Sequence, residues 1–482
     1  MKKTILLFTI ILFVYFSGFA QNKSDSLAKN RIDTLKTNAK GSKKLEKIKK
    51  GWTFGAVPAL AYDSDLGFRY GGLVNIYYFG DGSTYPRYYH SIYAEWSHTT
   101  KGSDKKTVSL DSWKLIPGVR FTTDVSYITE QGMDFYGFNG YESVFNTNLI
   151  ESKGLMTYTN YNNTQNNDSL IGIDTTNFSM SPYRLFYKND RKMLRVVMDF
   201  KGKLFLDKLQ WLAGLGFYNF QIGKVDYNKL NEDKDAKEVL LDSSLYRNFV
   251  KWNVIDKNEQ NGGSELFLKL GIVYDTRDNE PNPMKGIWSS LMLIQGHSFL
   301  DKDLNYTILA LTHRQYFTLV KEVLNFGYRL NYQQKIAGKI PFYFIPFVHS
   351  SQGNPIDGLG GSQTIRGVLR NRVVGDGMAF GNFEMRWKFL RTRLLKQNFY
   401  IAFSAFADMG MVIDRYDLNT DNVPDKYKSE FFKEKGDGIH IGYGAGLHFA
   451  INQNFIIACD YGRAVKKEDG NSGIYIGLNF LF

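Results

Sequence analysis

The chain alternates apolar and polar residues in segments of about ten residues, from Gly51 to its final residue. Turns rich in glycine, asparagine and aspartate separate these segments, and GIYIGLNFLF at 473–482 is the clearest of them. A period of two residues places alternate side chains on opposite faces of a β-strand. Repeated segments of this kind are typical of a transmembrane β-barrel. The face of the last segment that we expect to contact lipid consists of Ile474, Ile476, Leu478, Phe480 and Phe482.

Sixteen such segments predict an all-β fold, a 16-stranded antiparallel transmembrane β-barrel, and the even number brings both ends of the barrel to one side of the membrane. The predicted strands are 52–62, 67–79, 88–100, 106–116, 119–129, 182–206, 209–224, 264–275, 285–298, 304–318, 322–336, 376–390, 397–411, 438–450, 453–463 and 473–482. The long connections share one side, which we expect to be extracellular. They are 130–181, 225–263, 337–375 and 412–437.

A soluble β-sandwich is the alternative fold, since its strands also alternate. One face of each sandwich sheet would then be polar towards water. Here many strands carry aromatic residues on that face, and aromatic residues make up 16% of the chain. The pattern therefore favours a lipid-facing surface.

The first 20 residues have the features of a signal peptide. Lys2 and Lys3 precede an apolar run that ends in small residues, with Gly18 and Ala20 placed for cleavage before Gln21. A retained membrane anchor is the alternative, but the run is short for one. No later stretch reaches 18 apolar residues, so the sequence predicts an exported protein without a transmembrane helix.

The formal net charge of +12 is concentrated near the N-terminus. Residues 21–50 carry ten Lys and Arg against three acidic residues, and +3 remains for the region from Gly51 onward once the two leader lysines are removed. Because the excess positive charge is confined to this short segment, it does not indicate a nucleic-acid-binding surface. We expect 21–50 to be a basic, disordered periplasmic tail, with contact to anionic lipid or a periplasmic partner as the alternative. The predicted domains are 1–20, a signal peptide, 21–50, this tail, and 51–482, the barrel.

No catalytic or cofactor motif stands out, so we expect neither enzymatic activity nor a cofactor. The many glycines form no nucleotide-binding loop, and no nucleophile elbow is present. Asp417, Asn419 and Asp421 have the spacing of a calcium loop. However, Asn422 stands where such a loop needs glycine, and Lys428 stands where it needs glutamate. A polar outer loop is the favoured interpretation, and calcium the alternative.

Three motifs follow one another in the C-terminal half. The first, YDTRDNEPNPMKGIW at 274–288, lies on an inner turn, and the second, GGSQTIRGV, lies in the outer loop 337–375. The third pairs GNFEMRWKF at 381–389 with FADMG at 406–410 on the next strand. The residues that define these motifs are Asp275, Arg277, Asp278, Pro283, Gly286, Arg366, Gly367, Glu384 and Asp408.

This series resembles the C-terminal barrel of the BamA/TamA superfamily of outer-membrane assembly and secretion transporters, also called the bacterial surface antigen family. FYGFN at 135–139 and PALAYDSDLGFRYGG at 58–72 resemble its Bacteroidota-type branch. The resemblance covers about 51–482, and residues 21–50 are too short for even one periplasmic POTRA domain of the family. It implies a role in inserting or translocating protein or lipid at the bacterial outer membrane.

The third motif also has a physical interpretation of its own. If Glu384 and Asp408 point into the barrel from neighbouring strands, they need a cation. Arg366, on a loop folded back into the barrel, can offer a planar fork to both, and Gly367 permits close backbone approach. In the family, the matching loop arginine binds carboxylates at these strand positions, although here Val368 replaces the usual aromatic residue. The alternative is that Arg366 is a solvated loop charge.

Closure of the barrel would pair its first strand with its last. Pro58 removes a backbone donor there, and Gly473 and Gly477 add little packing near Phe482. The resemblance implies a seam that opens laterally. A permanently closed barrel with Pro58 at a bulge is the alternative.

The expected partners are outer-membrane lipid and other outer-membrane proteins, with no role for nucleic acid or nucleotide. Two further functions stay open at this point. One is an accessory barrel within a larger outer-membrane complex, and the other is a plugged channel for small solutes.

Overall fold

The computed structural model describes residues 49–85, 87–151, 181–206, 208–280, 282–299, 303–351, 356–394, 397–451, 455–478 and 480–482. The predicted signal peptide and nearly all of the predicted tail lie outside the described residues. Residues from Lys49 to Phe482 form one compact unit. Within the described part of the chain, no helix is long and apolar enough to cross a membrane.

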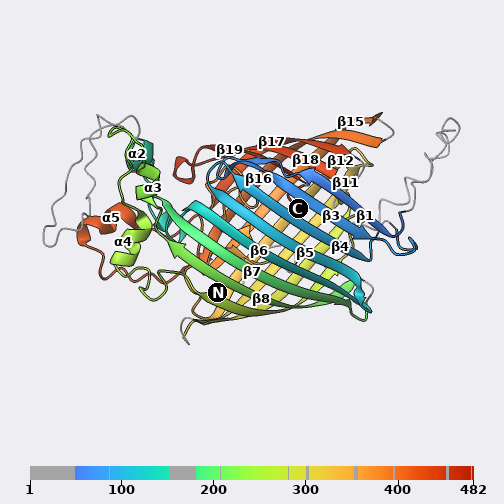
Figure 1. Cartoon of the computed structure of the whole chain (residues 1–482), viewed down its shortest axis with the longest axis horizontal. Coiled ribbons are helices and arrows are strands. Elements are labelled where there is room, and N and C mark those ends of the chain that lie inside the picture. Colours follow the sequence, from blue (N-terminus) through green and yellow to red (C-terminus); the bar gives the residue numbers. More distant parts are fainter. Residues whose placement is uncertain are drawn as a thin grey trace. The chain divides into compact units, whose positions relative to one another are not determined.

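The unit is a closed 16-stranded antiparallel β-barrel, as the sequence predicts (Figure 1). Its first strand has two pieces, β1 and β2, which both pair with β3. Each later barrel strand pairs with the next along the chain, and β19 pairs with β2 to close the barrel. The barrel strands are β1 (Trp52–Pro58), β2 (Ala61–Asp63), β3 (Gly67–Tyr78), β4 (His90–Thr99), β5 (Ser103–Ile116), β6 (Val119–Asp134), β7 (Lys188–Lys203), β8 (Leu209–Gly223), β9 (Ser264–Asp275), β10 (Gly286–Ser298), β11 (Asn305–Val320), β12 (Leu324–Gly338), β15 (Gly377–Leu394), β16 (Gln397–Asp414), β17 (His440–Ile451), β18 (Phe455–Ala464) and β19 (Ser472–Leu478).

Alternating burial along the strands shows why these segments form a barrel. In β10, Ser290, Met292 and Ile294 are buried, whereas Leu291 and Leu293 between them are exposed. Apolar side chains on the outer face suit contact with lipid, and closure of the sheet satisfies the backbone hydrogen bonds that lipid cannot.

The last predicted strand is corrected by the structure. β19 ends at Leu478, and Phe480 and Phe482 are buried rather than on the lipid-facing surface. The Arg386 guanidinium lies 4.2 Å from the centre of the Phe480 ring and donates a 3.0 Å hydrogen bond to the Phe482 carbonyl. This inward-facing cation draws the segment into the barrel, although the alternation of the sequence continues to the end.

The sixth predicted strand, 182–206, is also too long. β7 covers only Lys188–Lys203, and the preceding residues turn into the outer end of the barrel, where Tyr183, Phe186 and Tyr187 are buried. These aromatic side chains join a large buried cluster formed by the outer connections and by inward-facing residues of the strands. Aromatic content alone did not separate a lipid-facing strand from a packed loop.

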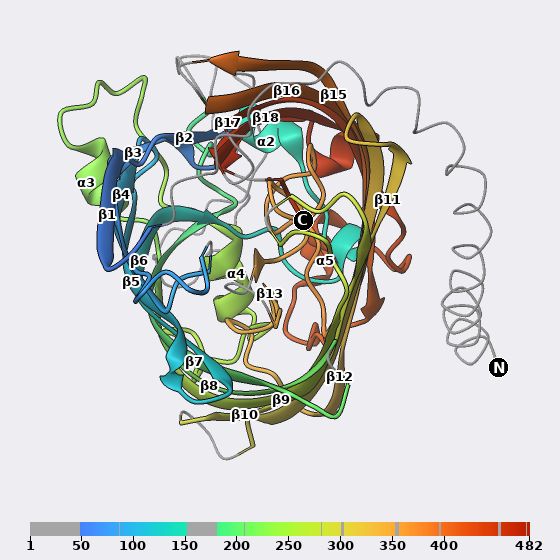
Figure 2. The same ribbon diagram turned by 90° about the vertical axis from the view of Figure 1, so that its right-hand side faces the viewer.

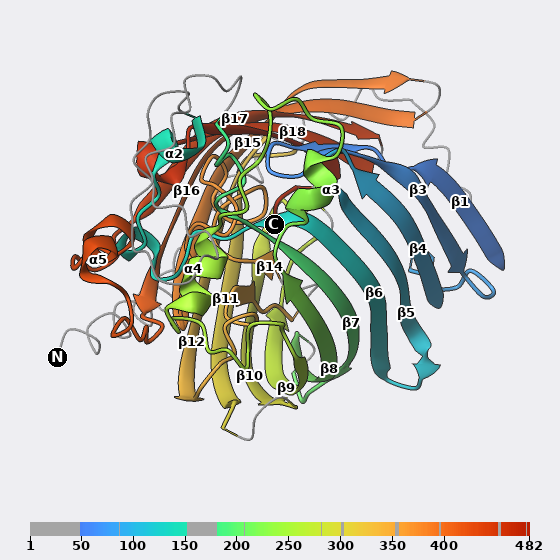
Figure 3. The same cartoon turned by 60° about the vertical axis from the view of Figure 1, so that its left-hand side comes forward.

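In the described part of the chain, short helices lie at one end of the barrel, on three of the four long connections and on the connection between β18 and β19 (Figure 3). The helices are η3 (Gly140–Glu142), α2 (Thr147–Glu151), α3 (Tyr227–Asn231), α4 (Leu245–Lys251), α5 (Asp425–Phe431) and η4 (Lys467–Asp469). His440 joins these connections at their base. Its Nε2 lies 2.9 Å from Asp437 Oδ1 and its Nδ1 lies 2.6 Å from Asp469 Oδ1, while its ring stacks on Tyr141 with centroids 3.8 Å apart.

The connection between β12 and β15, residues 339–376, turns inward and is here named the luminal loop. Figure 2 looks along the barrel and shows β13 (Phe347–Val348), which pairs with β14 (Ile356–Asp357), inside the ring of strands. The loop begins with an apolar run from Ile340 to Phe347, which packs on the inward-facing Tyr218, Phe220 and Phe267. This run anchors the loop to the barrel wall before its charged tip.

Candidate functional site: the luminal loop and the barrel seam

Arg366, at the tip of the luminal loop, is buried against two carboxylates of the barrel wall. Its Nε and Nη2 donate to Asp408 on β16 at 2.8 and 3.1 Å, and its backbone N–H donates to the same carboxylate at 3.1 Å. Its Nη1 donates to Glu384 on β15 at 3.2 Å. All three side chains are at most 1% exposed. The structure therefore brings together the loop arginine and the two carboxylates that the sequence singled out.

A third carboxylate and an aromatic ring complete this cluster, here named the loop lock. Arg366 Nη1 also donates to Asp460 on β18 at 2.9 Å, and the guanidinium lies over the Phe406 ring, 3.3 Å from its centre. Sequence reasoning missed both residues. Asp460 does fall on the inward face of its strand, and that phase was the signal that could have identified it.

The electrostatics of the loop lock favour a permanently charged loop residue. Burial alone would lower the pKa of the Arg366 guanidinium, but the neighbouring Asp408, Glu384 and Asp460 raise it above its ordinary value. Arg386 donates to Glu384 at 2.8 Å and supplies a second cation to the group. Removing Arg366 would leave Asp408 without its guanidinium partner, and removing either cation would leave Glu384 with one cation instead of two.

Small residues let the loop tip touch the barrel wall directly. Gly367 has a φ of 94°, and a Cβ there would lie 2.5 Å from backbone atoms of Arg463 on β18. A Cβ at Gly442 would collide with the Arg366 carbonyl, and a Cβ at Gly462 would lie 2.7 Å from the same carbonyl group. Glycines on two neighbouring strands thus form the surface against which the loop lies.

A second ion cluster fixes the luminal loop to the wall formed by β6 and β7. Arg191 donates from Nε to Glu130 at 2.9 Å and from Nη1 to Asp357 of the loop at 2.9 Å. Arg370 of the loop donates to Glu130 at 2.6 Å and to Asp357 at 2.8 Å. This set of four residues is here named the β6–β7 cluster. Burial would raise the pKa of Asp357, but the adjacent Arg191 and Arg370 hold it well below its ordinary value.

The seam of the barrel, where β19 meets β2, is the shortest contact between barrel strands among the described residues. Two residue pairs are in register there, Tyr475 with Asp63 and Ile476 with Tyr62. Pro58 ends β1 opposite Gly72, and the chain leaves the strand at the next two residues. Within the described residues, β1 pairs with β3 alone, so its other edge has no strand partner.

The two seam glycines differ in their surroundings. A Cβ at Gly473 would meet the Tyr475 ring, whereas a Cβ at Gly477 would meet nothing within 4 Å. The open space at Gly477 agrees with a loosely packed seam. Phe482, which the sequence placed beside these glycines, instead lies inside the barrel, 5.5 Å from the Arg329 guanidinium.

The inner-turn motif is held together by its own charged residues. Arg277 donates to Asp275 through Nε at 3.0 Å and through Nη2 at 2.8 Å. Asp278 Oδ1 accepts the backbone N–H groups of Met284 and Lys285 at 3.0 and 3.2 Å. These contacts give the turn between β9 and β10 a defined shape.

The other two motif residues, Pro283 and Gly286, lie at the end of the same turn. Gly286 has a φ of 109°, and a Cβ there would lie 2.5 Å from the Thr276 carbonyl oxygen. The Pro283 carbonyl accepts a 3.3 Å hydrogen bond from Asn325 on β12. The motif therefore links the turn to a strand two positions further around the barrel.

The calcium candidate forms a local turn. Asn419 accepts the backbone N–H of Asp421 at 3.0 Å. Among the described residues, no three His, Cys, Asp or Glu side chains gather in a way that could hold a metal ion. Ser404, His448 and Asp460 also lie together, but serine and aspartate both face His448 Nε2, at 3.5 and 2.9 Å. A serine relay needs them on opposite ring nitrogens.

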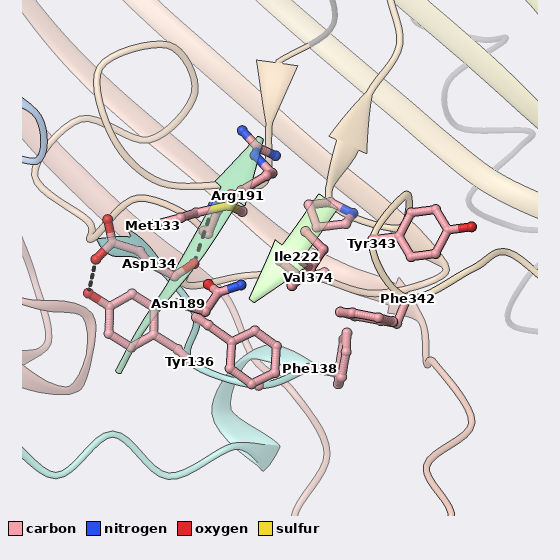
Figure 4. Close-up of a pocket in the computed structure, with 14 residues that line it drawn as sticks. Met133, Asp134, Tyr136, Phe138, Asn189, Arg191, Ile222, Phe342, Tyr343 and Val374 are labelled. Atoms are coloured by element: carbon pink, nitrogen blue, oxygen red, sulfur yellow. Dashed lines mark hydrogen bonds between the residues drawn. The ribbon is translucent and has the colours of Figure 1, made fainter. Parts of the chain in front are cut away.

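Two cavities border the luminal loop. The smaller, of about 30 Å³, lies between the apolar run and β6 to β8, with Tyr136, which donates to Asp134, on one side and Phe342 and Tyr343 on the other (Figure 4). It has room for water but not for a substrate. The larger, of about 380 Å³, is polar and lies beside the β6–β7 cluster. Its lining includes Asp63, Arg69, Lys105, Gly361 and Gln363.

Comparison with known protein families identifies one that covers most of the chain. Residues 119–482 match the Omp85 superfamily domain. Among solved structures, BamA from Haemophilus ducreyi lacking POTRA domains 1–3 is 14% identical, with 90% of this chain and 71% of that chain covered and a TM-score of 0.49. CdiB from Acinetobacter baumannii is 13% identical, with 90% of this chain and 61% of that chain covered and a TM-score of 0.45. No curated protein matches the sequence.

The domain match extends from β6 to the end of the chain, and so it includes the loop lock, the inner-turn motif and the last strand of the seam. The family resemblance and the membrane location expected from the sequence are thereby confirmed. This chain belongs to the Omp85 superfamily, a family of bacterial outer-membrane β-barrels with roles in insertion and translocation.

Proposed function

We propose that this barrel inserts or translocates a protein substrate at the outer membrane. The substrate leaves through the seam, and the luminal loop blocks the lumen until then. The observation that carries this proposal is the seam, which has two residue pairs in register next to an edge of β1 that pairs with no strand in the described part of the chain. An unpaired strand edge offers backbone donors and acceptors to another extended chain. A lipid substrate that leaves by the same opening is the other form of this proposal.

The attachment of the luminal loop disfavours an open channel for small solutes. The loop lock fixes it to β15, β16 and β18, and the β6–β7 cluster fixes it to a different part of the wall. A loop held at both places would need to break buried ion pairs before it could leave the lumen. Such a loop favours a barrel that opens only for a protein cargo over a channel that conducts small solutes continuously.

A disulfide across the seam tests this function. Tyr62→Cys and Ile476→Cys replace residues that face each other in register, and Cys459→Ser removes the native thiol. In a strain depleted of the wild-type protein, we expect the oxidised variant to lose the outer-membrane cargo proteins and the reduced variant to restore them. Quantitative outer-membrane proteomics gives the measurement.

A matched disulfide controls for the effect of cross-linking itself. Ile457→Cys and Leu478→Cys face each other between β18 and β19, on the same last strand but away from the seam. This pair should leave the cargo proteins unchanged. Normal cargo levels with the seam locked would rule out lateral exit and favour an accessory role in a larger complex.

A further inference from the structure

We propose that residues 361–367 of the luminal loop form a clasp across the inside of the seam, with Tyr475 as the positioning residue that couples the loop lock to the seam. The seam would then open only after the loop tip has moved. A role of this coupling in cargo release rests on the proposed function. The coupling itself can be measured in the barrel without cargo.

The β19 side of the seam contacts the loop next to the lock. Tyr475 points into the barrel and is 7% exposed, and its hydroxyl accepts the backbone N–H of Gly367 at 3.0 Å. Gly367 follows Arg366, which the loop lock holds in place. Tyr475 is also one of the two β19 residues in register with β2. A single side chain therefore takes part in the seam and contacts the loop tip.

The β2 side of the seam contacts the other end of the same loop segment. A Cβ at Gly361 would lie 3.2 Å from Asp65 Oδ2, so the loop backbone packs against the turn that follows β2. That turn closes the outer end of the seam, because Ser64 donates its N–H to the Ile474 carbonyl at 3.1 Å. Its hydroxyl accepts the Ile474 N–H at 2.8 Å. Loop residues six positions apart thus contact β19 and the turn that follows β2, one on each side of the seam.

The Asp65 carboxyl group of this turn also responds to the loop. Asp65 Oδ2 has no hydrogen-bond partner among the described residues. Burial and the nearby Asp63 and Asp134 raise the pKa of Asp65 to about 7, while Arg370 of the loop opposes that shift. Withdrawal of the loop would remove the favourable charge of Arg370 and leave the turn more exposed to water. Both changes act on the same end of the seam.

The strength of the coupling follows from the small number of seam contacts among the described residues. Two register pairs and the Ser64–Ile474 contacts are few beside the seven pairs between β18 and β19. The Gly367–Tyr475 hydrogen bond is therefore a substantial share of what resists opening. An ordinary hydrogen bond shifts an opening equilibrium by roughly two- to tenfold.

Hydrogen–deuterium exchange of the purified full-length barrel tests the clasp without any cargo. We expect Tyr475→Phe, which keeps the ring but removes the hydroxyl, to speed exchange in peptides from β2 and β19 by roughly two- to tenfold. The matched control is Tyr461→Phe on β18, whose ring faces outward and is 49% exposed. Heat-modifiability on gels selects folded barrels before the measurement.

A double-mutant cycle then tests the link to the lock. Glu384→Gln weakens the lock from β15, far from the seam along the sheet, and is milder than loss of Arg366. When Tyr475 is present, Glu384→Gln should increase the exchange rate of peptides from β2 and β19. In the Tyr475→Phe variant, the same substitution should increase that rate by a smaller factor. The clasp is overturned if Tyr475→Phe speeds exchange no more than Tyr461→Phe does, or if the two effects simply add. Because no cargo is present, neither result bears on whether a locked seam blocks insertion.

Discussion

Arg366 and Asp408 are joined by three hydrogen bonds, two from the guanidinium and one from the backbone N–H, so the residue is held as a rigid unit. A side-chain ion pair alone would leave the loop backbone free to shift. Here the carboxylate on β16 also fixes the main chain at the loop tip. This explains how one arginine can position the neighbouring Gly367 against β18.

Replacement of Arg366 by alanine is expected to loosen the luminal loop and destabilise the barrel. Three buried carboxylates would lose their shared cation, a change that costs about 3–5 kcal/mol when a buried ion pair is broken. Arg366→Lys should have a smaller effect, since it keeps the charge but loses the planar fork. Planar-bilayer conductance and heat-modifiability provide the measurements. Unchanged values of both for the alanine variant would exclude a locking role.

The β6–β7 cluster predicts an acid-sensitive attachment of the loop. The pKa of Asp357 is lowered in the folded protein, so its contribution to stability is present above the ordinary value of 3.8 and is lost as the pH falls below it. Asp357→Asn should lower stability at neutral pH by about 1.5–3 kcal/mol and reduce the acid sensitivity. Thermal unfolding between pH 3 and pH 7 tests this.

The matched control for that variant is Asp104→Asn. Asp104 also borders the large polar cavity, but its partner is His98 rather than the luminal loop. Its replacement should change the thermal stability and its acid sensitivity little. An equal loss of stability and of acid sensitivity in both variants would show that the β6–β7 cluster does not hold the loop.

The strands could be predicted because lipid imposes a period of two on every outward face. The segment predicted at 264–275 is β9, Ser264–Asp275, and its neighbours differ by only a few residues. Glu384 and Asp408 could be paired because they lie on adjacent strands. The phase of its strand places Asp460 on the inward face, but its contact with Arg366 could not be predicted, since contact across two strands depends on the register of the whole sheet, which the sequence does not show.

The β6–β7 cluster was missed for a different reason. Glu130 falls one residue beyond the predicted fifth strand, because the polar residues there resemble the start of a loop, whereas β6 continues to Asp134. Lumen-facing strand ends and outer loops have the same composition. Phe480 and Phe482 show the reverse error, in which a lipid-like pattern continues while Arg386 draws the chain inward.

The seam should weaken as the pH rises from about 4 to about 7. The pKa of Asp65 is raised in the folded protein, from 3.8 to about 7, so the folded state keeps a proton that the unfolded chain releases. Stability contributed by this proton is complete below the unfolded pKa and is lost as the pH rises through the folded one. Hydrogen exchange in β2 and β19 at pH 5 and pH 8 measures the effect.

Asp65→Asn removes the titrating group and should flatten that pH dependence. Asp425→Asn is a suitable control, since its side chain is 95% exposed and lies far along the chain in α5. If the exchange of seam peptides stays equally pH-dependent in both variants, another group is responsible.

Gly367→Ala should destabilise the protein more than Gly477→Ala, although both glycines lie near the seam. At Gly367 the φ of 94° strains any residue with a Cβ, at a cost of about 1–2 kcal/mol, and that Cβ would also lie 2.5 Å from the Arg463 backbone. The loop tip would have to retreat from β18 and lose the hydrogen bond to Tyr475. At Gly477 a Cβ meets nothing within 4 Å, so alanine there should change the melting temperature little. Thermal unfolding followed by heat-modifiability, with seam exchange at a fixed pH, compares the two variants. Equal stability and equal exchange would mean that the loop tip does not need its close approach to the wall.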